Sequence, residues 1–449
     1  MTSVFSQYSD LKDRIASKDA RVMTVGLGYV GLPLALTIQE AGFHTTGLDV
    51  NGARVEAINA GEKVISYFSD TRISDAVSSG HFGATSDAAA VSDADVVLIC
   101  VPTPLSKTRE PDLTYVVGAA ETIARYLRPG QLVVLESTVW PGATTGVVQP
   151  ILERSGLKAG TDFFLGFSPE REDPGNETHT TRTIPKIVGA DDKHSRDLLE
   201  MLYSQIVDQV VPVSSSATAE AVKLAENSFR TVNIALVNEM KVAMDAMGVD
   251  VWEVVQAAAT KPFGYMPFYP GPGIGGDCIP VSPVYLSWRA RDVGSQTPII
   301  DLAHSTNETA PEAIAARIVA GLKSRADVAV DGAKLLMLGV AYKKNVEDTR
   351  ESPALAALTW LEDMGAHCDY HDPYFPVMPK TRDHSTLAGR KSVPLTDKVV
   401  AGYDAVIVMT DHTQVDYPLV AENARLAFDT RNVFDGNGIE ITGDRLIKI

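Results

Sequence analysis

The sequence predicts an α/β protein with two doubly wound, Rossmann-like domains joined by a helical central domain with a long spine helix. Short apolar strands alternate with helical patterns from residue 21, and the same alternation restarts near Asp331. A long helical pattern lies between them, over 217–247. A chain of 449 residues is too long for one core. We therefore expect four parts, namely an N-terminal arm (1–20), a first Rossmann domain (21–213), a helical domain (214–325) and a second Rossmann-like domain (326–449).

The composition bounds the function. Hydrophobic residues make up 45% and charged residues 22%, as in ordinary soluble α/β proteins, and the net charge of −17 argues against binding to nucleic acid or a membrane surface. No apolar run reaches transmembrane length, and residues 1–20 lack the apolar core of a signal peptide and read as a short amphipathic helix or a frayed arm. Three scattered cysteines, Cys100, Cys278 and Cys368, predict neither disulfides nor a metal site, and fit a reducing cytoplasm.

The first strand and helix carry a dinucleotide-binding pattern. The strand 21–25 runs into a G-x-G-x-x-G loop, the helical pattern 32–41 follows, and the strand 44–48 ends at an acid. Glycines permit a tight turn and close approach to a pyrophosphate at the helix N-terminus. We expect this loop to bind the cofactor through Gly26, Gly28, Tyr29, Val30 and Gly31.

The acid that follows is Asp49, which would accept both ribose hydroxyls and repel a 2′-phosphate, so NAD is favoured over NADP. Arg54, one turn into the next helix, is placed to flank the adenosine. Ligands of open parallel sheets gather where strands end. Thr103 and Thr138 follow the predicted strands 95–101 and 131–135, so their hydroxyls are expected cofactor contacts; outside this fold they would be ordinary polar loop residues.

Further strands are predicted at 163–167, 186–188 and 209–213, and the long helix follows. Apolar residues recur along this helix at steps of three and four, which predicts one buried face: Val222, Ala225, Phe229, Val232, Leu236, Met240 and Ala243. Lys223 and Asn227 lie one turn apart on another face, where a lysine is ordinarily a solvated surface residue.

The last third reads as helix, then βα units. Helical patterns cover 284–291 and 299–322, and a strand is expected at 334–339. The helix 353–364 is opened by Ser352, a good N-cap, with proline at the first helical position. Later strands are predicted at 405–409 and 426–428.

A glycine-rich loop, Gly271 to Pro280, holds four glycines and two prolines, so its backbone can lie against a ligand. Cys278 sits where the glycines end and a helical run begins. A helix N-terminus lowers a thiol pKa and makes the sulfur a better nucleophile. The alternative is a tight turn with a buried cysteine, the ordinary state of an isolated cysteine. The glycine density favours the nucleophile.

Eight stretches in this order resemble the nucleotide-sugar 6-dehydrogenase (UDP-glucose/GDP-mannose dehydrogenase) family. They run from Val22 to Phe434 and are GLGYVGLP, GLDVN, CVPTPL, ESTVWPGAT, FSPEREDPGN, KLAENSFR, KPFGYMPFYPGPGIGGDCIP and GVAYKKNVEDTRESP. FSPEREDPGN and KPFGYMPFYPGPG look most like the branch that acts on UDP-N-acetylglucosamine. The UDP-N-acetylmannosamine branch is the next closest, and the UDP-glucose branch typically shows PEFL after the same strand.

The resemblance implies oxidation of a sugar C6 alcohol to a carboxylate with two NAD, through a cysteine thiohemiacetal and thioester. Cys278 matches the nucleophile, and Glu170 the glutamate that works with a water in proton transfer and thioester hydrolysis. Lys223 matches the lysine that stabilises oxyanion charge. Asn227 matches its hydrogen-bonding neighbour, and Thr138 the threonine that positions the water.

Binding residues also follow from the resemblance. Tyr269, Ile274 and Gly275 would line the UDP-sugar, beside Glu170, Lys223 and Asn227. From the C-terminal, UDP-sugar-binding domain, Lys343 would reach the substrate and Arg350 the NAD phosphates.

Two further implications concern the partner subunit and the sugar. The long helix would build a homodimer, with a residue near Lys261 supplied by the partner. Arg171 and Glu172 replace apolar residues of the UDP-glucose branch, so a more polar pocket would suit an acetamido sugar. The family also implies a product used in surface polysaccharide.

Two positions depart from the family pattern. Asp277 stands where relatives with this loop usually have histidine, and Ser282 where the family has a water-ordering aspartate. An anion beside Cys278 should raise the thiol pKa, and serine cannot act as a carboxylate base.

Three interpretations follow: an active four-electron enzyme in which Asp277 takes over some of the lost charge, a weakened or silent nucleotide-sugar-binding homologue, or a two-electron dehydrogenase with the same domain order. A two-electron dehydrogenase needs no nucleophilic cysteine, so Cys278 argues against it. The NADH formed per sugar, two, none or one, separates them.

Overall fold

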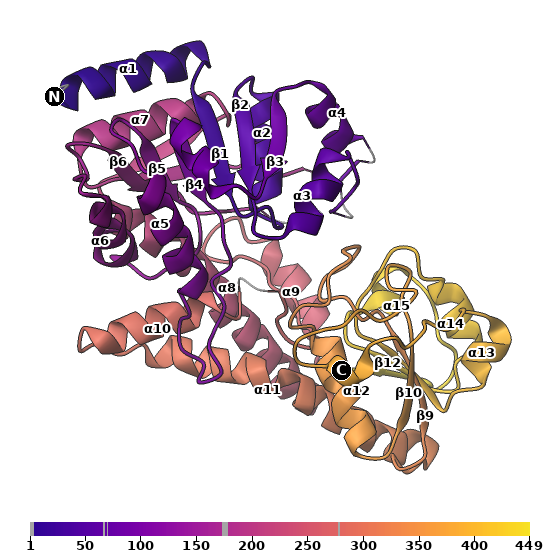
Figure 1. Cartoon of the computed structure of the whole chain (residues 1–449). Coiled ribbons are helices and arrows are strands. Elements are labelled where there is room, and N and C mark those ends of the chain that lie inside the picture. The colour runs from indigo at the N-terminus through magenta and orange to yellow at the C-terminus, as the bar shows by residue number, and fades with distance from the viewer. Residues whose placement is uncertain (1–3, 66–67, 70, 173–177, 277–278) are drawn as a thin grey trace. The chain divides into compact units, whose positions relative to one another are not determined.

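The computed structural model describes residues 4–65, 68–69, 71–172, 178–276 and 279–449 (Figure 1). The chain forms two compact units: Met1–Glu226 with Val284–Gln296, and Asn227–Pro283 with Thr297–Ile449. The segment 214–325, which we expect to be a helical domain, contributes to both units. Both units contain a sheet of mainly parallel strands with helices around it, as predicted.

The first unit holds an eight-stranded sheet in the order β3-β2-β1-β4-β5-β6-β7-β8. Its strands are β1 (Arg21–Val25), β2 (His44–Leu48), β3 (Phe82–Thr85), β4 (Val96–Ile99), β5 (Leu132–Leu135), β6 (Phe164–Phe167), β7 (Lys186–Gly189) and β8 (Val210–Val213). Strands β1 to β6 are parallel and have the doubly wound Rossmann order. β7 pairs antiparallel with β6 and parallel with β8. The carboxyl ends of six strands therefore meet at one edge.

Helices cover this sheet. They are α1 (Val4–Ser17), α2 (Gly31–Glu40), α3 (Gly52–Asn59), α4 (Arg72–Ser78), α5 (Thr114–Tyr126), α6 (Gln149–Leu152), α7 (Lys193–Ser204) and most of α10 (Ser282–Asp292), with short turns η1 (Ala88–Asp93), η2 (Thr144–Val148) and η3 (Glu153–Ser155). The N-terminal segment is helical, and Leu11 and Ile15 of α1 pack into the core that α7 shares with the sheet. The amphipathic reading of this segment is confirmed.

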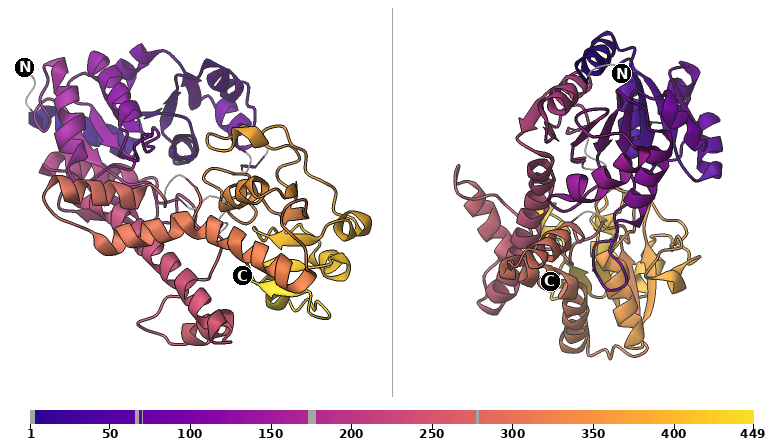
Figure 2. Two further views of the ribbon diagram at one scale, coloured as in Figure 1. Left: turned by 90° about the horizontal axis from the view of Figure 1, so that it is seen from below. Right: turned by 60° about the vertical axis from the view of Figure 1, so that its left-hand side comes forward.

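The second unit holds a five-stranded parallel sheet in the order β10-β9-β11-β12-β13. Its strands are β9 (Lys334–Leu338), β10 (His367–His371), β11 (Ala405–Val408), β12 (Ala427–Asp429) and β13 (Leu446–Lys448). Its helices are α9 (Val251–Ala259), α11 (Pro298–Gly321), α12 (Pro353–Asp363), α13 (Asp397–Ala401), α14 (Tyr417–Asn423) and α15 (Val433–Gly436), with turns η4 (Leu322–Ala326) and η5 (Ser385–Leu387). One face packs against α11 and α12, the other against α13, α14 and α15. Figure 2 shows α11 (orange) along its length.

The spine helix α8 (Ser216–Ala246) forms as predicted, but the prediction of its buried face is wrong. Phe229 and Leu236 of the apolar row are 51% and 52% exposed in the single chain. The buried row is polar and includes Lys223, Asn227 and Thr231. A polar row can be buried because its groups hydrogen-bond to loops. The apolar row is half-buried or exposed, with Phe229 packed edge-on against Phe268.

The N-cap of α12 also differs in detail from the prediction. Ser352 holds the N-cap position with Pro353 behind it, but its side chain makes no capping bond. Its hydroxyl donates instead to the carbonyl of Val340 at 2.8 Å. Ser352 thus ties the start of α12 to the loop after β9.

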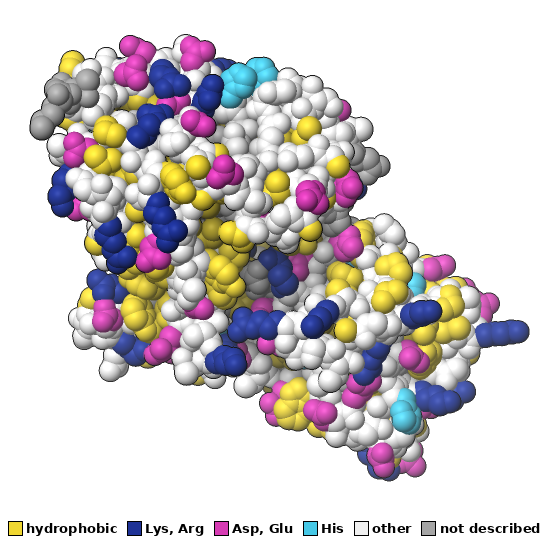
Figure 3. Space-filling view, viewed as in Figure 1, with side chains coloured by type: hydrophobic (Ala, Val, Ile, Leu, Met, Phe, Trp, Pro, Cys, Tyr) yellow, Lys and Arg dark blue, Asp and Glu magenta, His cyan; other side chains and the backbone are white. Residues whose placement is uncertain are grey.

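Charged side chains of both signs share the surface. Lys and Arg side chains are interspersed with Asp and Glu over the face seen in Figure 3. Over the described ranges, none of the helices is both long and apolar enough to cross a membrane. The same part of the chain shows no group of three or more His, Cys, Asp or Glu placed to hold a metal ion.

Candidate active site

The glycine loop after β1 has the shape a dinucleotide needs. Gly26 has φ +93°, and a Cβ on it would lie 2.7 Å from the carbonyl oxygen of Cys100. A Cβ on Gly31 would lie 1.8 Å from the carbonyl oxygen of Gly26. Val30, at the N-cap of α2, makes no side-chain cap. Only glycine fits these turns, and no side chain caps the N-terminus of α2, where a pyrophosphate is expected to bind.

Asp49 lies at the end of β2 and holds this loop. Its two oxygens accept the backbone N–H groups of Leu27 and Asn51, both at 2.8 Å. Arg54 donates to the carbonyl of Leu27 at 3.1 Å and lies beside Gly28. The expected cofactor residues of β1, α2 and β2 are therefore brought together, and the cradle fits NAD. Tyr29 is exposed at its rim.

Thr103 and Thr138 lie in loops past the ends of β4 and β5, as predicted. Ser137 donates to the carbonyl of Val101 at 2.7 Å and so fixes the loop of Thr138 against β4. Tyr285 of α10 donates to the carbonyl of Thr103 at 3.0 Å. Tyr285 was not predicted as a site residue. The signal available in the sequence was a tyrosine seven residues past Cys278, and its burial is seen only in the fold.

A buried ion pair joins Glu170 to the spine helix. The Lys223 ammonium donates to the Glu170 carboxylate at 3.0 Å and to its backbone carbonyl at 2.6 Å. Both side chains are at most 10% exposed. The two residues come from the end of β6 and from α8, so the fold brings together two groups that the motifs assign to catalysis.

Arg171 and Glu172 contact protein groups. Arg171 pairs with Glu226 at 2.5 Å and donates to the carbonyl of Pro185. Glu172 accepts a hydrogen bond from Thr181, and burial raises its pKa to about 7.

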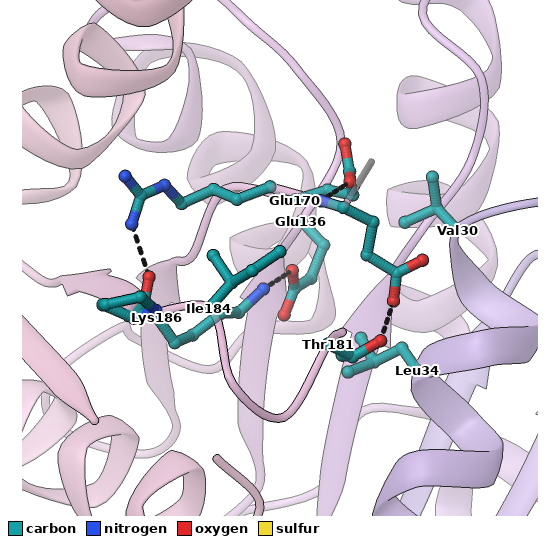
Figure 4. Close-up of a pocket in the computed structure, with 10 residues that line it drawn as sticks. Val30, Leu34, Glu136, Glu170, Thr181, Ile184 and Lys186 are labelled. Carbon is teal, nitrogen blue, oxygen red and sulfur yellow. Dashed lines mark hydrogen bonds and ion pairs between the residues drawn. The ribbon is translucent and has the colours of Figure 1, made fainter. Parts of the chain in front are cut away.

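Glu172 helps to line a pocket. Figure 4 shows this pocket, with Val30 and Leu34 on one side and Glu136 and Lys186 on the other. Its volume of about 20 Å³ is enough to hold a water.

A second buried network lines one side of this pocket. Lys186 donates to Glu136 at 2.5 Å (Figure 4). It also donates to the carbonyl of Pro169 at 3.1 Å. The Tyr203 hydroxyl donates to the other oxygen of Glu136. Burial raises the pKa of Glu136, and it raises the pKa of Tyr203 well above its ordinary value. Sequence reasoning missed all three residues, because Glu136 and Lys186 stand alone among apolar neighbours.

In the second unit the glycine-rich loop lies against the loop after β9. Gly276 donates its N–H to the carbonyl of Arg350 at 2.9 Å, and a Cβ on Gly275 would lie 2.5 Å from the Cβ of Tyr342. The N–H of Gly271 donates to Asn238 of α8 at 2.9 Å. The glycines thus permit close packing between two backbone segments. Ile274 is half-buried in the same loop.

Asn227 is buried, and its amide donates to the hydroxyl of Ser282 at 2.8 Å. The hydroxyl that replaces the family's aspartate is therefore engaged by a predicted catalytic residue. Cys278 and Asp277 lie outside the described residues. The two described cysteines are poor nucleophiles, since burial raises the pKa of Cys100 well above its ordinary value and that of Cys368 to about 12.

The remaining predicted substrate residues are more scattered. Tyr269 stacks on Trp252, with ring centroids 5.4 Å apart. Lys261 is exposed, with its ammonium over the ring of Phe263. Among the described residues, Lys261 forms no hydrogen bond or ion pair with the glycine-rich loop.

Lys343 and Arg350 lie in the loop that follows β9. Arg350 forms a forked pair with Asp348, with bonds of 2.6 and 3.0 Å. Lys343 is half-buried, and His412 holds its loop by accepting the N–H of Asn345 at 2.9 Å. The other ring nitrogen of His412 lies 3.1 Å from Asp372, whose pKa is lowered because hydrogen bonds from His412 and the backbone outweigh burial.

Comparisons with known proteins extend over nearly the whole chain. Three domain models of the UDP-glucose/GDP-mannose dehydrogenase family match: the NAD-binding domain over 20–207, the central domain over 217–309 and the UDP-binding domain over 336–436. A UDP-N-acetyl-D-glucosamine 6-dehydrogenase of Pseudomonas aeruginosa is 33% identical, covering 91% of this chain and 94% of the relative. A UDP-N-acetyl-D-mannosamine dehydrogenase of Pyrococcus horikoshii is also 33% identical, over 92% and 96%.

Solved structures are similar as well. The structure of a UDP-D-ManNAc dehydrogenase from Pyrococcus horikoshii matches with a TM-score of 0.84 and 31% identity, covering 96% of this chain and 99% of that one. A UDP-glucose dehydrogenase from Pyrobaculum islandicum matches with a TM-score of 0.83 and 27% identity, over 95% and 98%.

Proposed function

The chain belongs to the UDP-glucose/GDP-mannose dehydrogenase family, and we propose that it oxidises the C6 hydroxyl of UDP-N-acetylglucosamine to the uronic acid with two NAD. It is an NAD-dependent oxidoreductase of the nucleotide-sugar class. The observation that carries the proposal is the buried contact between Lys223 and Glu170. These are the two described residues that the motifs assign to oxyanion stabilisation and proton transfer.

The chemistry uses this chain's residues as follows. Cys278 adds its thiolate to the C6 aldehyde, and Lys223, with Asn227, stabilises the oxygen that becomes negative. Glu170 takes up a proton and, with a water placed by Thr138, hydrolyses the thioester. The loop 26–31 and Asp49 would hold NAD, flanked by Arg54, Thr103, Thr138 and Arg350, and the bound cofactor would accept the hydride in each half of the reaction.

The UDP-sugar would be held by the glycine-rich loop and the C-terminal domain. Ile274 and Gly275 offer backbone groups, Tyr269 a ring face and Lys343 a cation for the diphosphate. Arg171 and Glu172 contact Glu226 and Thr181. We therefore assign these two residues an indirect influence on the sugar, through the shape of the loop that follows Glu170.

A homodimer completes the proposal. Phe229 and Leu236 are half-exposed on α8, and Val242 on the same helix is 57% exposed. An apolar row of this kind on a long helix suits a second copy of the chain. Lys261 would then meet the partner's substrate. The product, a UDP-linked uronic acid, would serve surface polysaccharide synthesis.

The experiment is the NADH yield on limiting UDP-N-acetylglucosamine, with UDP-N-acetylmannosamine and UDP-glucose in parallel. We expect two NADH per acetylglucosamine, and little from the other sugars. Cys278→Ser should abolish the second NADH, whereas Cys100→Ser, at a buried thiol, should keep the yield. One NADH per sugar from the unmodified protein would refute the four-electron reaction.

The second candidate is UDP-N-acetylmannosamine as substrate, because relatives with both names are equally similar. A weakened homologue is the third, because Ser282 presents a neutral hydroxyl to Asn227 where the family has an acid. Loss of turnover in Asp277→Asn would support the idea that Asp277 replaces the charge lost at Ser282. Unchanged turnover at every pH would refute that idea. A burst below one NADH per sugar would favour the weakened enzyme.

A further inference from the structure

Glu136, Lys186 and Tyr203 form a buried polar network at the carboxyl edge of the large sheet. Glu136 directly follows β5, Lys186 begins β7 and Tyr203 lies in α7. The side chain of Glu136 is 0% exposed and that of Lys186 9%. The Lys186 ammonium also lies 5.2 Å from the centre of the Tyr203 ring. Three separate elements thus converge on one carboxylate.

A contribution to the stability of the fold does not explain why this network is polar. Removing a carboxylate and an ammonium from water costs several kcal/mol per ion, and apolar side chains of similar volume often serve a core as well or better. One side of the network packs against an apolar core that includes Val134, Phe164 and Val188. A polar network in such surroundings restricts geometry, because each of its donors must keep a particular acceptor.

The network's bonds end at the two loops that carry the proposed chemistry. Lys186 divides its ammonium between Glu136, two residues before Thr138, and the carbonyl of Pro169, one residue before Glu170. The carbonyl that follows, that of Glu170 itself, accepts Lys223. Two consecutive carbonyls are therefore each held by a buried ammonium, one from β7 and one from α8.

We propose that Glu136, Lys186 and Tyr203 are positioning residues that fix the peptide between Pro169 and Glu170, so that the Glu170 carboxylate keeps the orientation its role requires. The inference rests on the proposed function, because it concerns the step that Glu170 serves. In that step water hydrolyses the thioester. The carbonyl carbon gains the water oxygen, the C–S bond breaks, the sulfur of Cys278 recovers a hydrogen and the new carboxyl loses its proton.

Positioning can be separated from an electrostatic effect. The groups that face Glu136 are Lys186, Tyr203, Glu170 and Cys100, and the pocket adds Arg171 and Glu172. The pair Glu136→Gln with Lys186→Met removes one negative and one positive charge, so the net charge around Glu170 stays the same. It removes the donor to Pro169 without leaving an ion unpaired.

The matched control is the pair Asp95→Asn with Arg128→Met, at the amino edge of the same sheet. Asp95 is 2% exposed and accepts Arg128 at 2.5 Å, so the control also neutralises a buried carboxylate and its cation. A milder second comparison is Tyr203→Phe against Tyr370→Phe. Tyr370 is a fully buried tyrosine of the second unit that donates to the carbonyls of Phe375 and Arg390.

We expect the Glu136/Lys186 pair to lower kcat about tenfold, because small misplacement of a reacting group costs rate steeply. KM for NAD and for the UDP-sugar should stay within about twofold, and the pH profile of kcat should not move. A covalent sugar adduct should accumulate, measured by intact-protein mass spectrometry. Tyr203→Phe should show the same pattern at about threefold.

The Asp95/Arg128 pair and Tyr370→Phe should keep kcat and show no adduct. If the Glu136/Lys186 pair does not fold, Tyr203→Phe decides. A kcat equal to that of the control, or a shifted pH profile, would overturn the positioning role. If the unmodified protein itself forms no NADH from any of the three sugars, the proposed function fails, and the inference falls with it.

Discussion

The large sheet has a buried carboxylate at each of its two edges, and the two differ in what they hold. At the amino edge Asp95 accepts Arg14 and Arg128, each at 2.5 Å, and the N–H of Arg21 at 2.8 Å. At the carboxyl edge Glu136 accepts Lys186 and Tyr203. The arginines of Asp95 are about one-third exposed, whereas the partners of Glu136 are buried.

The difference shows that a buried ion pair can serve either the stability of the fold or the geometry of the site. Asp95 fastens α1 and the loop before β5 to the start of β1, so its bonds close the fold at an edge with no predicted site residue. Glu136 is bound through Lys186 to the loop that carries Glu170. We therefore expect changes at the amino edge to alter the free energy of unfolding, and changes at the carboxyl edge to alter turnover first.

Lys223→Met should give the largest effect. Removing a cation that stabilises developing charge typically costs a factor of about 10³ in kcat, or about 4 kcal/mol. The melting temperature should also fall, since removing one partner of a buried ion pair leaves the Glu170 carboxylate without its cation. Steady-state NADH formation measures kcat, and calorimetry measures the melting temperature. A variant that loses stability but keeps kcat would contradict the proposed difference between the two edges of the sheet.

Asp95→Ala should do the reverse and destabilise the fold by about 3 kcal/mol, because it leaves the Arg21 N–H and two cations without their acceptor. Denaturant unfolding measures the loss, and kcat at a temperature where the variant is folded should match that of the unmodified protein. A tenfold fall in kcat would show that the amino edge also serves catalysis.

Glu172→Gln should change how stability depends on pH. The folded state keeps the Glu172 proton up to about pH 7, whereas an unfolded glutamate loses it near its ordinary pKa of 4.5. Stability should therefore fall as pH rises between these values, by about 2 kcal/mol from pH 5 to pH 7. The variant should lack this decline in melting temperature. Parallel curves for the two proteins would contradict the raised pKa.

Arg14→Met should give the smallest effect. The Arg14 side chain is 35% exposed, and exposed ion pairs contribute about 0.5 kcal/mol. Asp95 keeps Arg128 and the Arg21 N–H as donors. Urea unfolding should therefore detect a small shift, with no change in NADH yield. A loss as large as that of Asp95→Ala would mean that α1 docking depends on this one bond.

The sequence predicted the elements whose patterns are local. β1 and β2 begin and end at the predicted residues, because a G-x-G-x-x-G loop and an acid bound them. The short strand β3 was not predicted, since Phe82 is its only large apolar residue. The buried face of α8 was predicted wrongly, because burial of Lys223 and Asn227 depends on partners more than 50 residues away.

The site divides in the same way. Motif residues such as Asp49, Glu170 and Lys223 were identifiable, and their roles remain predictions. Glu136, Lys186 and Tyr203 were not, because their significance comes from meeting one another across β5, β7 and α7. Ser282 was recognised as a departure, but its bond to Asn227 needed the fold.

The polar row of α8 has a consequence for the order in which the chain folds. Lys223 bonds to a residue 53 positions away, Asn227 to one 55 positions away and Thr231, through its backbone carbonyl, to one 76 positions away. Contacts that close such long loops form slowly, since the loop entropy is lost before they reward it. We expect mutations along this row to speed unfolding and leave the folding rate nearly unchanged, with φ-values near zero. The helix that anchors the chemistry would then be among the last to dock.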